Sequence, residues 1–354
     1  MNLLEEALLL FDNDEKIDLL FELADVYDDY EEFDKVFECL CLILEQEPSN
    51  EEALYKICFW TDFTGRNEES IRLHQKLIDQ QPYSELAWFN LGSAYQGLKL
   101  YEKAVDAYQY AVVINEKFDY AYRNLGDAYI RLRRYKEAIE VLEKVGEITR
   151  PEEVIYEAIG HCYHRLGKFA QARFNYRKAS HMNPADSKLY YKIALTYISE
   201  EQWQSAIKQL ENALHINRHS PEYNLATGQC ALQLKNYKDA VHYFSLAVRS
   251  RPKNVRGWEA LIKCLLESKH YEEAVQQCIS ALKNTENKPV FYFLYSAVLF
   301  AANKTKEALH QLENGLKSAP QHIKKFVELN PAILQNHQVV DMIATYRKTK
   351  RKKR

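Results

Sequence analysis

Residues 85–118 read ELAWFNLGSAYQGLKLYEKAVDAYQYAVVINEKF, and residues 119–152 read DYAYRNLGDAYIRLRRYKEAIEVLEKVGEITRPE. Aligned without a gap, the two segments show one pattern of aromatic, small and aliphatic residues. The same 34-residue register runs from Ile17 to His322 without insertion or deletion. The nine repeats begin at Ile17, Glu51, Glu85, Asp119, Glu153, Ser187, Pro221, Val255 and Pro289. A strict period of this length predicts an array of one supersecondary unit, each copy packed on its neighbours.

The spacing within each repeat predicts two amphipathic helices joined by a short turn. Apolar and small residues recur three and four positions apart, which places them on one stripe of a helix. In the third repeat this set is Trp88, Leu91, Gly92, Tyr95, Ala104, Tyr108 and Ala111. Position 8 of most repeats is glycine or alanine and position 20 is alanine in seven of them, so we expect two helices to approach closely there. Eight of the nine prolines lie where one repeat meets the next, where a helix must end or begin.

These residues resemble the tetratricopeptide repeat, whose pattern is W-x2-L-G-x2-Y…A-x3-F…A…P. The resemblance implies an all-α fold, a right-handed α-solenoid or superhelix of nine repeats with helical caps. It further implies a protein-interaction scaffold that holds an extended peptide or partner helix in its concave groove. We expect an N-terminal capping helix over residues 1–16, the repeats over 17–322, closing helices over 323–347 and a basic tail over 348–354. In the closing helices, Ile333, Val339, Val340 and Ile343 are predicted to cover the last repeat.

Charge is distributed unevenly, although the formal net charge is only −3. Residues 1–53 hold 18 acidic and 2 basic side chains, whereas residues 321–354 hold 9 basic and 2 acidic ones. A cationic run at a chain end is typical of a solvated tail. The alternatives are binding of nucleic acid or another polyanion, and salt-dependent head-to-tail self-assembly of an otherwise monomeric chain. The candidate polyanion-binding residues are Lys348, Lys350, Arg351, Lys352, Lys353 and Arg354.

Location is inferred from what the chain lacks. No apolar stretch reaches membrane-spanning length, and Glu5 and Glu6 interrupt the apolar N-terminal run, unlike a secretory signal. The seven cysteines include no CxxC pair, and Cys162, Cys230 and Cys264 share one core position of the repeat. We therefore expect buried, reduced thiols and a cytoplasmic location.

By resemblance, positions 2, 5, 6, 9, 12 and 13 of each first helix face the groove. The predicted peptide-binding residues in repeats three to six are Phe89, Asn90, Tyr120, Arg123, Asn124, Asp127, Arg131, Glu157, His161, His164, Lys188, Tyr191 and Lys192. Asn90 and Asn124 share position 6 and suggest a short asparagine ladder, because an amide both donates to and accepts from a peptide backbone. The family's carboxylate clamp is incomplete here, since Asp127 stands where an asparagine belongs.

The first two repeats predict a different groove, with acidic residues beside aromatic ones. Its residues are Asp18, Glu22, Asp25, Asp28, Asp29, Glu52, Tyr55, Phe59 and Phe63. Such a surface suits a basic segment or a cation. The alternative is a solvated acidic end that keeps the array soluble.

Catalytic signatures are missing from the sequence. No G-x-x-x-x-G-K-[ST], G-x-G-x-x-G, H-E-x-x-H or G-x-S-x-G string occurs. Glu157, His161 and His164 lie at i, i+4 and i+7, but a stable metal site needs ligands from elsewhere as well. We therefore expect no metal, no cofactor and no enzymatic activity.

Overall fold

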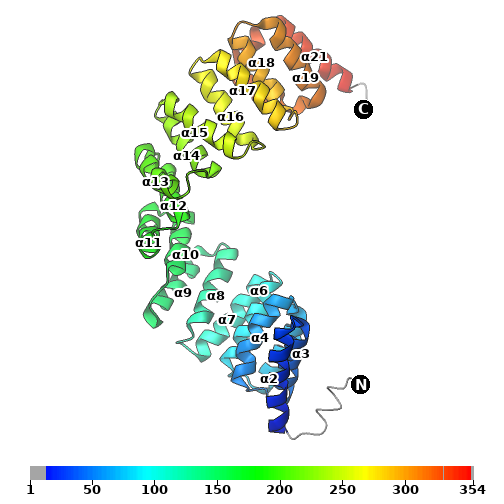
Figure 1. Ribbon diagram of the computed structural model, residues 1–354, viewed down its shortest axis with the longest axis vertical. Helices are drawn as coiled ribbons and strands as arrows, with labels where there is room; N and C mark the ends of the chain where they lie inside the picture. The colour runs from blue at the N-terminus through cyan, green and yellow to red at the C-terminus, as the bar shows by residue number, and fades with distance from the viewer. Residues whose placement is uncertain (1–12, 330, 352–354) are drawn as a thin grey trace. The chain divides into compact units, whose positions relative to one another are not determined.

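The computed structural model describes residues 13–329 and 331–351, and the chain divides after Met182 into two compact units. Each unit is a stack of antiparallel helix pairs (Figure 1). Within the described ranges there is no β-strand, and none of the helices there is both long and apolar enough to cross a membrane. The predicted all-α repeat solenoid is thus confirmed. The predicted N-terminal cap lies mostly outside the described residues, because the first helix described begins at Asn13.

The helices of the first unit form repeats one to five, two helices to a repeat. They are α2 (Asn13–Asp29), α3 (Phe33–Gln46), α4 (Glu51–Thr64), α5 (Asn67–Gln80), α6 (Glu85–Gly97), α7 (Tyr101–Ile114), α8 (Asp119–Arg131), α9 (Tyr135–Ile148), α10 (Glu153–Arg165) and α11 (Phe169–Met182).

The second unit holds repeats six to nine and the closing segment. Its helices are α12 (Ser187–Ser199), α13 (Trp203–Ile216), α14 (Pro221–Gln233), α15 (Tyr237–Ser250), α16 (Val255–Glu267), α17 (Tyr271–Asn284), α18 (Val290–Ala301), α19 (Thr305–Ser318), the 3-10 turn η1 (Pro320–His322), α20 (Ile323–Leu329), η2 (Pro331–Gln335) and α21 (His337–Arg351).

Repeat junctions are built from short polar side chains and prolines. Asn50, Ser84 and Ser220 occupy the last position of a repeat, and each side chain accepts from a backbone N–H of the helix that follows. The indole of Trp88 donates to the carbonyl of Pro82 at 2.8 Å. The indole of Trp258 likewise donates to the carbonyl of Pro252, also at 2.8 Å. A junction proline therefore both ends one helix and anchors the first helix of the next repeat.

The turn inside every repeat places position 15 in the left-handed region. Its φ is +72° at both Gly65 and Gly167, and between +57° and +63° at the other seven positions, none of which is glycine. At Lys99 the backbone N–H donates to the carbonyl of Gln96, and the next N–H reaches back to Tyr95 at 2.9 Å. This is the hydrogen-bond pattern that closes helices with a left-handed residue. Seven repeats thus adopt a conformation that glycine favours, without glycine.

The core of a repeat is a large side chain packed on a small residue. Tyr108 is fully buried, and a Cβ added at Gly92 would lie 2.6 Å from its ring. Tyr176 packs on Gly160 and Phe244 on Gly228 in the same way. The alanines at position 20 (Ala104, Ala138, Ala172, Ala206, Ala240, Ala274 and Ala308) are fully buried. The predicted close approach of the two helices at positions 8 and 20 is confirmed.

Repeat two replaces this apolar core with polar side chains that bond to one another. Thr61 and Ser70 occupy usual core positions, and the hydroxyl of Thr61 donates to that of Ser70 at 3.2 Å. His74 is fully buried, and its Nδ1 lies 2.8 Å from the carbonyl oxygen of Ser70, so this nitrogen carries the proton and donates. Burial lowers the pKa of His74 to about 4. The core of this repeat therefore depends on an uncharged histidine.

The cysteines and the closing segment complete the core. Cys162, Cys230 and Cys264 are buried as predicted, and burial raises the pKa of each of these three thiols. All seven cysteines lie within the described residues, and none of them is in a disulfide there. Buried Ile333 and Val339 and partly buried Ile343 pack on the last repeat as expected. Val340 is 42% exposed, so its predicted place in the cap is wrong; buried Phe326 packs there against Phe293, which spacing alone did not reveal.

Candidate functional site

The predicted peptide-binding residues fall in both units. In the first unit they belong to α6, α8 and α10, which are the first helices of repeats three to five. In the second unit Lys188, Tyr191 and Lys192 belong to α12.

On α6 the two predicted residues are not presented alike. Phe89 is half-buried, with its ring centroid 5.1 Å from that of Phe118 and 5.7 Å from that of Tyr108. Asn90 is only 2% exposed, and its amide donates to the carbonyl of Leu54 in the preceding repeat at 2.7 Å. This corrects the predicted asparagine ladder. Asn90 joins two repeats, because a buried amide needs a partner inside the protein, and it is not available to a peptide.

Helix α8 carries the most accessible part of the set. Tyr120 is 55% exposed, whereas Ala121, Leu125 and Gly126 on the opposite face are buried. Asn124 is half-buried, and its amide donates to the hydroxyl of Tyr108 over 3.4 Å, a long bond. The exposed tyrosine and the partly exposed amide lie one turn apart on one stripe of the helix.

The charges on α8 are paired within the unit. Arg123 lies 3.4 Å from Asp119 and 3.2 Å from Glu152, and only 20% of its side chain is exposed. The guanidinium that the sequence offered to a ligand is therefore already held by two carboxylates. Asp127 accepts from Gln96 at 3.1 Å and lies 3.4 Å from Arg131, whose side chain is 59% exposed. Arg131 thus offsets the charge of Asp127 and remains accessible.

Helix α10 contributes two aromatic-flanked histidines and a pair of carboxylates. His161 lies edge-on to Tyr135 and His164 lies beside Phe169, with ring centroids 6.3 and 5.5 Å apart. Burial, and then the charge of Arg165, lower the pKa of His164. Both imidazoles lie against rings of neighbouring second helices, a packing that the i, i+4, i+7 spacing with Glu157 did not indicate.

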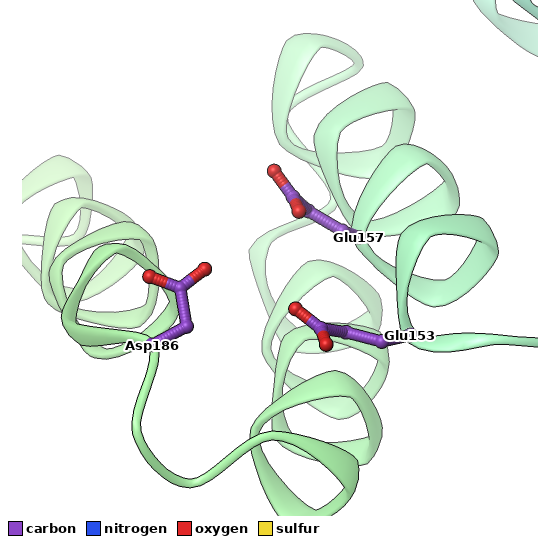
Figure 2. Close-up of side chains that lie close together, drawn as sticks. All are labelled: Glu153, Glu157 and Asp186. Carbon is purple, nitrogen blue, oxygen red and sulfur yellow. The ribbon is translucent and has the colours of Figure 1, made fainter.

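Figure 2 shows Glu153 and Glu157 one turn apart on α10. Asp186, also labelled there, precedes α12 in the second unit, where its carboxylate accepts from the backbone N–H of Lys188 at 2.8 Å. Capping of a helix N-terminus explains this aspartate.

On α12 the predicted residues are an exposed lysine and two half-buried side chains. Lys188 is exposed, whereas Tyr191 and Lys192 are half-buried. The ring of Tyr191 lies 4.9 Å from that of Tyr223, and burial raises its pKa. Of the candidate polyanion-binding residues, Lys348, Lys350 and Arg351 belong to the last turns of α21, with side chains outside the described part. Lys352, Lys353 and Arg354 lie outside the described residues altogether.

Sequence reasoning missed a groove of about 660 Å³ in the first unit. Its lining comes from α9, α10, α11 and the α9–α10 connection: Leu142, Glu143, Gly146, Pro151, Ile155, Tyr156, Ile159, Tyr163, Ala170, Gln171, Phe174, Asn175 and Lys178. Phe174 is 59% exposed, and the ammonium of Lys178 lies 4.6 Å from its ring centroid and 4.8 Å from that of Tyr156. A comparison of equivalent repeat positions indicates this groove, because every other repeat has a polar residue where the fifth has Phe174.

The stacked helix pairs, with small residues packed under large ones, define an α-helical repeat array. Residues 18–225 match the family described as the C-terminal ARM domain of tetratricopeptide repeat protein 21, and residues 195–334 match the second ARM domain of the same protein. The first match covers more than half of the chain. The chain therefore belongs to this family of tetratricopeptide-type repeat proteins, which confirms the predicted resemblance.

Solved structures agree on the fold. The C-terminal part of a tetratricopeptide-repeat protein from Cytophaga hutchinsonii is 14% identical, with a TM-score of 0.58 over 72% of this chain and 99% of that one. PilW, described as a type IV pilus biogenesis factor, is 18% identical, with a TM-score of 0.51 over 60% of this chain and 99% of its own. No curated protein sequence matches the chain. Helical repeat arrays of this kind generally present surfaces to other proteins.

Proposed function

We propose that the chain is a non-enzymatic interaction scaffold, and that the exposed stripe of α8 binds an extended peptide segment of a partner protein. The observation that carries the proposal is the contrast between the two faces of α8. One face is buried in the repeat core, while the other offers Tyr120, Asn124 and Arg131 in line. Each of the three supplies a different kind of contact.

The contacts follow from the chemistry of the three side chains. Tyr120 supplies a rigid aromatic surface, the kind of residue that contributes most at interfaces. The Asn124 amide both donates and accepts, which suits a peptide backbone. Arg131 offers forked donors to a carboxylate of the partner. Because these side chains stand on a preformed helix, the ordering cost of binding falls mainly on the peptide.

Site-specific photo-crosslinking tests the proposal. A p-benzoylphenylalanine at position 120 should cross-link a partner in an extract of the source cells, and Arg131→Glu in the same protein should reduce that product at least about tenfold. The matched control carries the photo-reactive residue at the exposed position of Glu140, on the second helix of the same repeat. Equal products from positions 120 and 140, or a product insensitive to Arg131→Glu, would contradict the assignment.

A further inference from the structure

Repeats one and two expose a cluster of aromatic rings on α4. Tyr55, Phe59 and Phe63 are 68%, 61% and 57% exposed, and each lies one turn from the next on a single stripe of the helix. Phe63 packs edge-on to Phe33 with ring centroids 4.7 Å apart, and half-buried Trp60 stacks on Phe33 with ring centroids 5.5 Å apart. The exposed rings therefore stand on a fixed aromatic base. A contiguous exposed patch of this kind marks an interaction surface.

Carboxylates lie beside these rings, and those at one end of the surface have no basic partner among the described residues. Asp25 of α2 lies 3.9 Å from Lys56 of α4, which brings the two first helices side by side. Asp28 and Asp29 follow one turn later, are exposed, and make no salt bridge within the part of the chain that the structure describes. Because first helices of successive repeats run in the same direction, Asp28 and Asp29 lie towards the same end of this surface as Phe59 and Phe63.

The helix ends add to the negative potential. α2 ends at Asp29 and α4 ends at Thr64, and neither has a basic residue in its last turn. The carboxyl end of a helix carries a partial negative charge that favours cations. Rings, carboxylates and two helix ends thus all favour positive charge at the same place.

The first unit already shows how such a surface holds a cation. Three basic residues of repeats one and two each lie over an aromatic ring and beside a carboxylate. They are Lys35, over Tyr27 and 3.4 Å from Glu32; Lys56, over Phe21 and 2.8 Å from Glu52; and Arg66, over Phe37 and 3.0 Å from Glu38. Each combines cation–π attraction with an ion pair. Phe59 and Phe63, with Asp28 and Asp29, offer the same combination to a cation from outside.

The spacing of the rings indicates the shape of that cation. Side chains four residues apart on a helix are separated by about 6 Å along its axis. Alternate side chains of an extended chain are about 6.7 Å apart. Phe59 and Phe63 stack on each other, with ring centroids 5.9 Å apart and ring planes inclined by 22°. An extended peptide with basic residues at i, i+2 and i+4 therefore matches the spacing of Tyr55, Phe59 and Phe63 along the helix.

We propose that this acidic aromatic surface, formed by Asp25, Asp28, Asp29, Tyr55, Phe59 and Phe63, binds an extended segment of a partner protein in which lysine or arginine occupies alternate positions. The surface shares no residue with the α8 stripe, so either site can fail without the other. Charge complementarity selects the occupant: the surface repels polyanions, and its rings give basic side chains more than a diffuse electrostatic attraction.

The experiment measures binding of two labelled peptides of equal charge to the full chain by fluorescence anisotropy. One is SRSRSRS, with alternating arginines, and the other is SSRRRSS, with adjacent ones. We expect the alternating peptide to bind at least about fivefold more tightly. The Phe59→Ser/Phe63→Ser variant should lose at least about tenfold in affinity for it, and Asp28→Asn/Asp29→Asn should lose affinity and flatten the salt dependence. Phe174→Ser, which removes an exposed ring elsewhere in the unit, should leave binding unchanged.

Three results would overturn the proposal. Equal affinity for the two peptides would mean that charge alone is bound. Unchanged binding by Phe59→Ser/Phe63→Ser would show that the rings take no part in binding. If this phenylalanine variant fails to fold, Asp28→Asn/Asp29→Asn still tests the proposal, because both aspartate side chains are exposed. If deletion of residues 348–354 raises peptide affinity several-fold, the occupant is the chain's own basic end and not a partner.

Discussion

The buried imidazole of His74 makes the stability of the first unit depend on pH in a calculable way. The side chain is fully buried, its Nδ1–H is donated to the Ser70 carbonyl, and its Nε2 is buried without a partner among the described residues. Protonation would place an unpaired charge in the core, so its pKa falls from 6.5 to about 4. The unfolded chain takes up a proton near pH 6.5, whereas the folded protein does not until near pH 4.

The sign and size follow from this difference. The stabilisation is fully present above pH 6.5 and is lost as the pH falls towards 4, because only the unfolded state gains protons in that window. At about 1.4 kcal/mol for each tenfold change in proton affinity, the whole effect is roughly 3 kcal/mol. About 2 kcal/mol of it should be lost between pH 7 and pH 5.

The control variant is His74→Leu, because leucine occupies the equivalent position in repeats one, four, six and nine. Urea unfolding is followed by tryptophan fluorescence in a background where Trp203 and Trp258 of the second unit are phenylalanine, so that the signal reports the first unit. Carboxylate titration is common to both proteins and cancels in their difference. Wild type should lose about 2 kcal/mol more than His74→Leu between pH 7 and pH 5. Parallel pH profiles would refute the argument, since His74 would then be accessible to solvent.

Further predictions concern glycines and asparagines in the same fold. Gly167→Ala should lower the free energy of unfolding by about 1 kcal/mol, because the backbone there has a φ of +72°. Gly146→Ala, inside α9, should raise the free energy of unfolding by up to about 1 kcal/mol, because the new Cβ meets only Pro151, at 3.5 Å. Lys235→Gly should stabilise the second unit by about 0.5–1 kcal/mol by relieving a φ of +57°, and an unchanged urea midpoint would count against strain there. Asn90→Ala should cost about 1 kcal/mol through its lost bond to Leu54, while Asn124→Ala should be nearly neutral; equal urea midpoints would show that Asn90 does not join the repeats.

Much of the fold follows from the sequence by itself. Helix positions, repeat boundaries and core columns were predictable because they rest on local periodicity, and one 34-residue alignment averages nine independent copies of it. Position 8 illustrates the point: the small residues Gly92, Gly126, Gly160 and Gly228 predicted a close approach of two helices, which the structure shows. The side chains that pack there (Tyr108, Leu142, Tyr176 and Phe244) were identified only by the structure. The left-handed turns were visible only at Gly65 and Gly167, since the surrounding helices impose the same φ on seven non-glycine residues.

Which polar side chains are accessible to a ligand was decided by the tertiary structure. Asn90 and Asn124 share one repeat position, yet the first is buried against Leu54 and the second is partly exposed. Arg123, which the family resemblance assigned to a ligand, is held by Glu152, 29 residues away in the sequence. A repeat position determines which way a side chain leaves its helix, but its partner comes from another helix, tens of residues distant. Whether a polar group is paired, buried or free for a ligand therefore emerges only when the repeats are stacked.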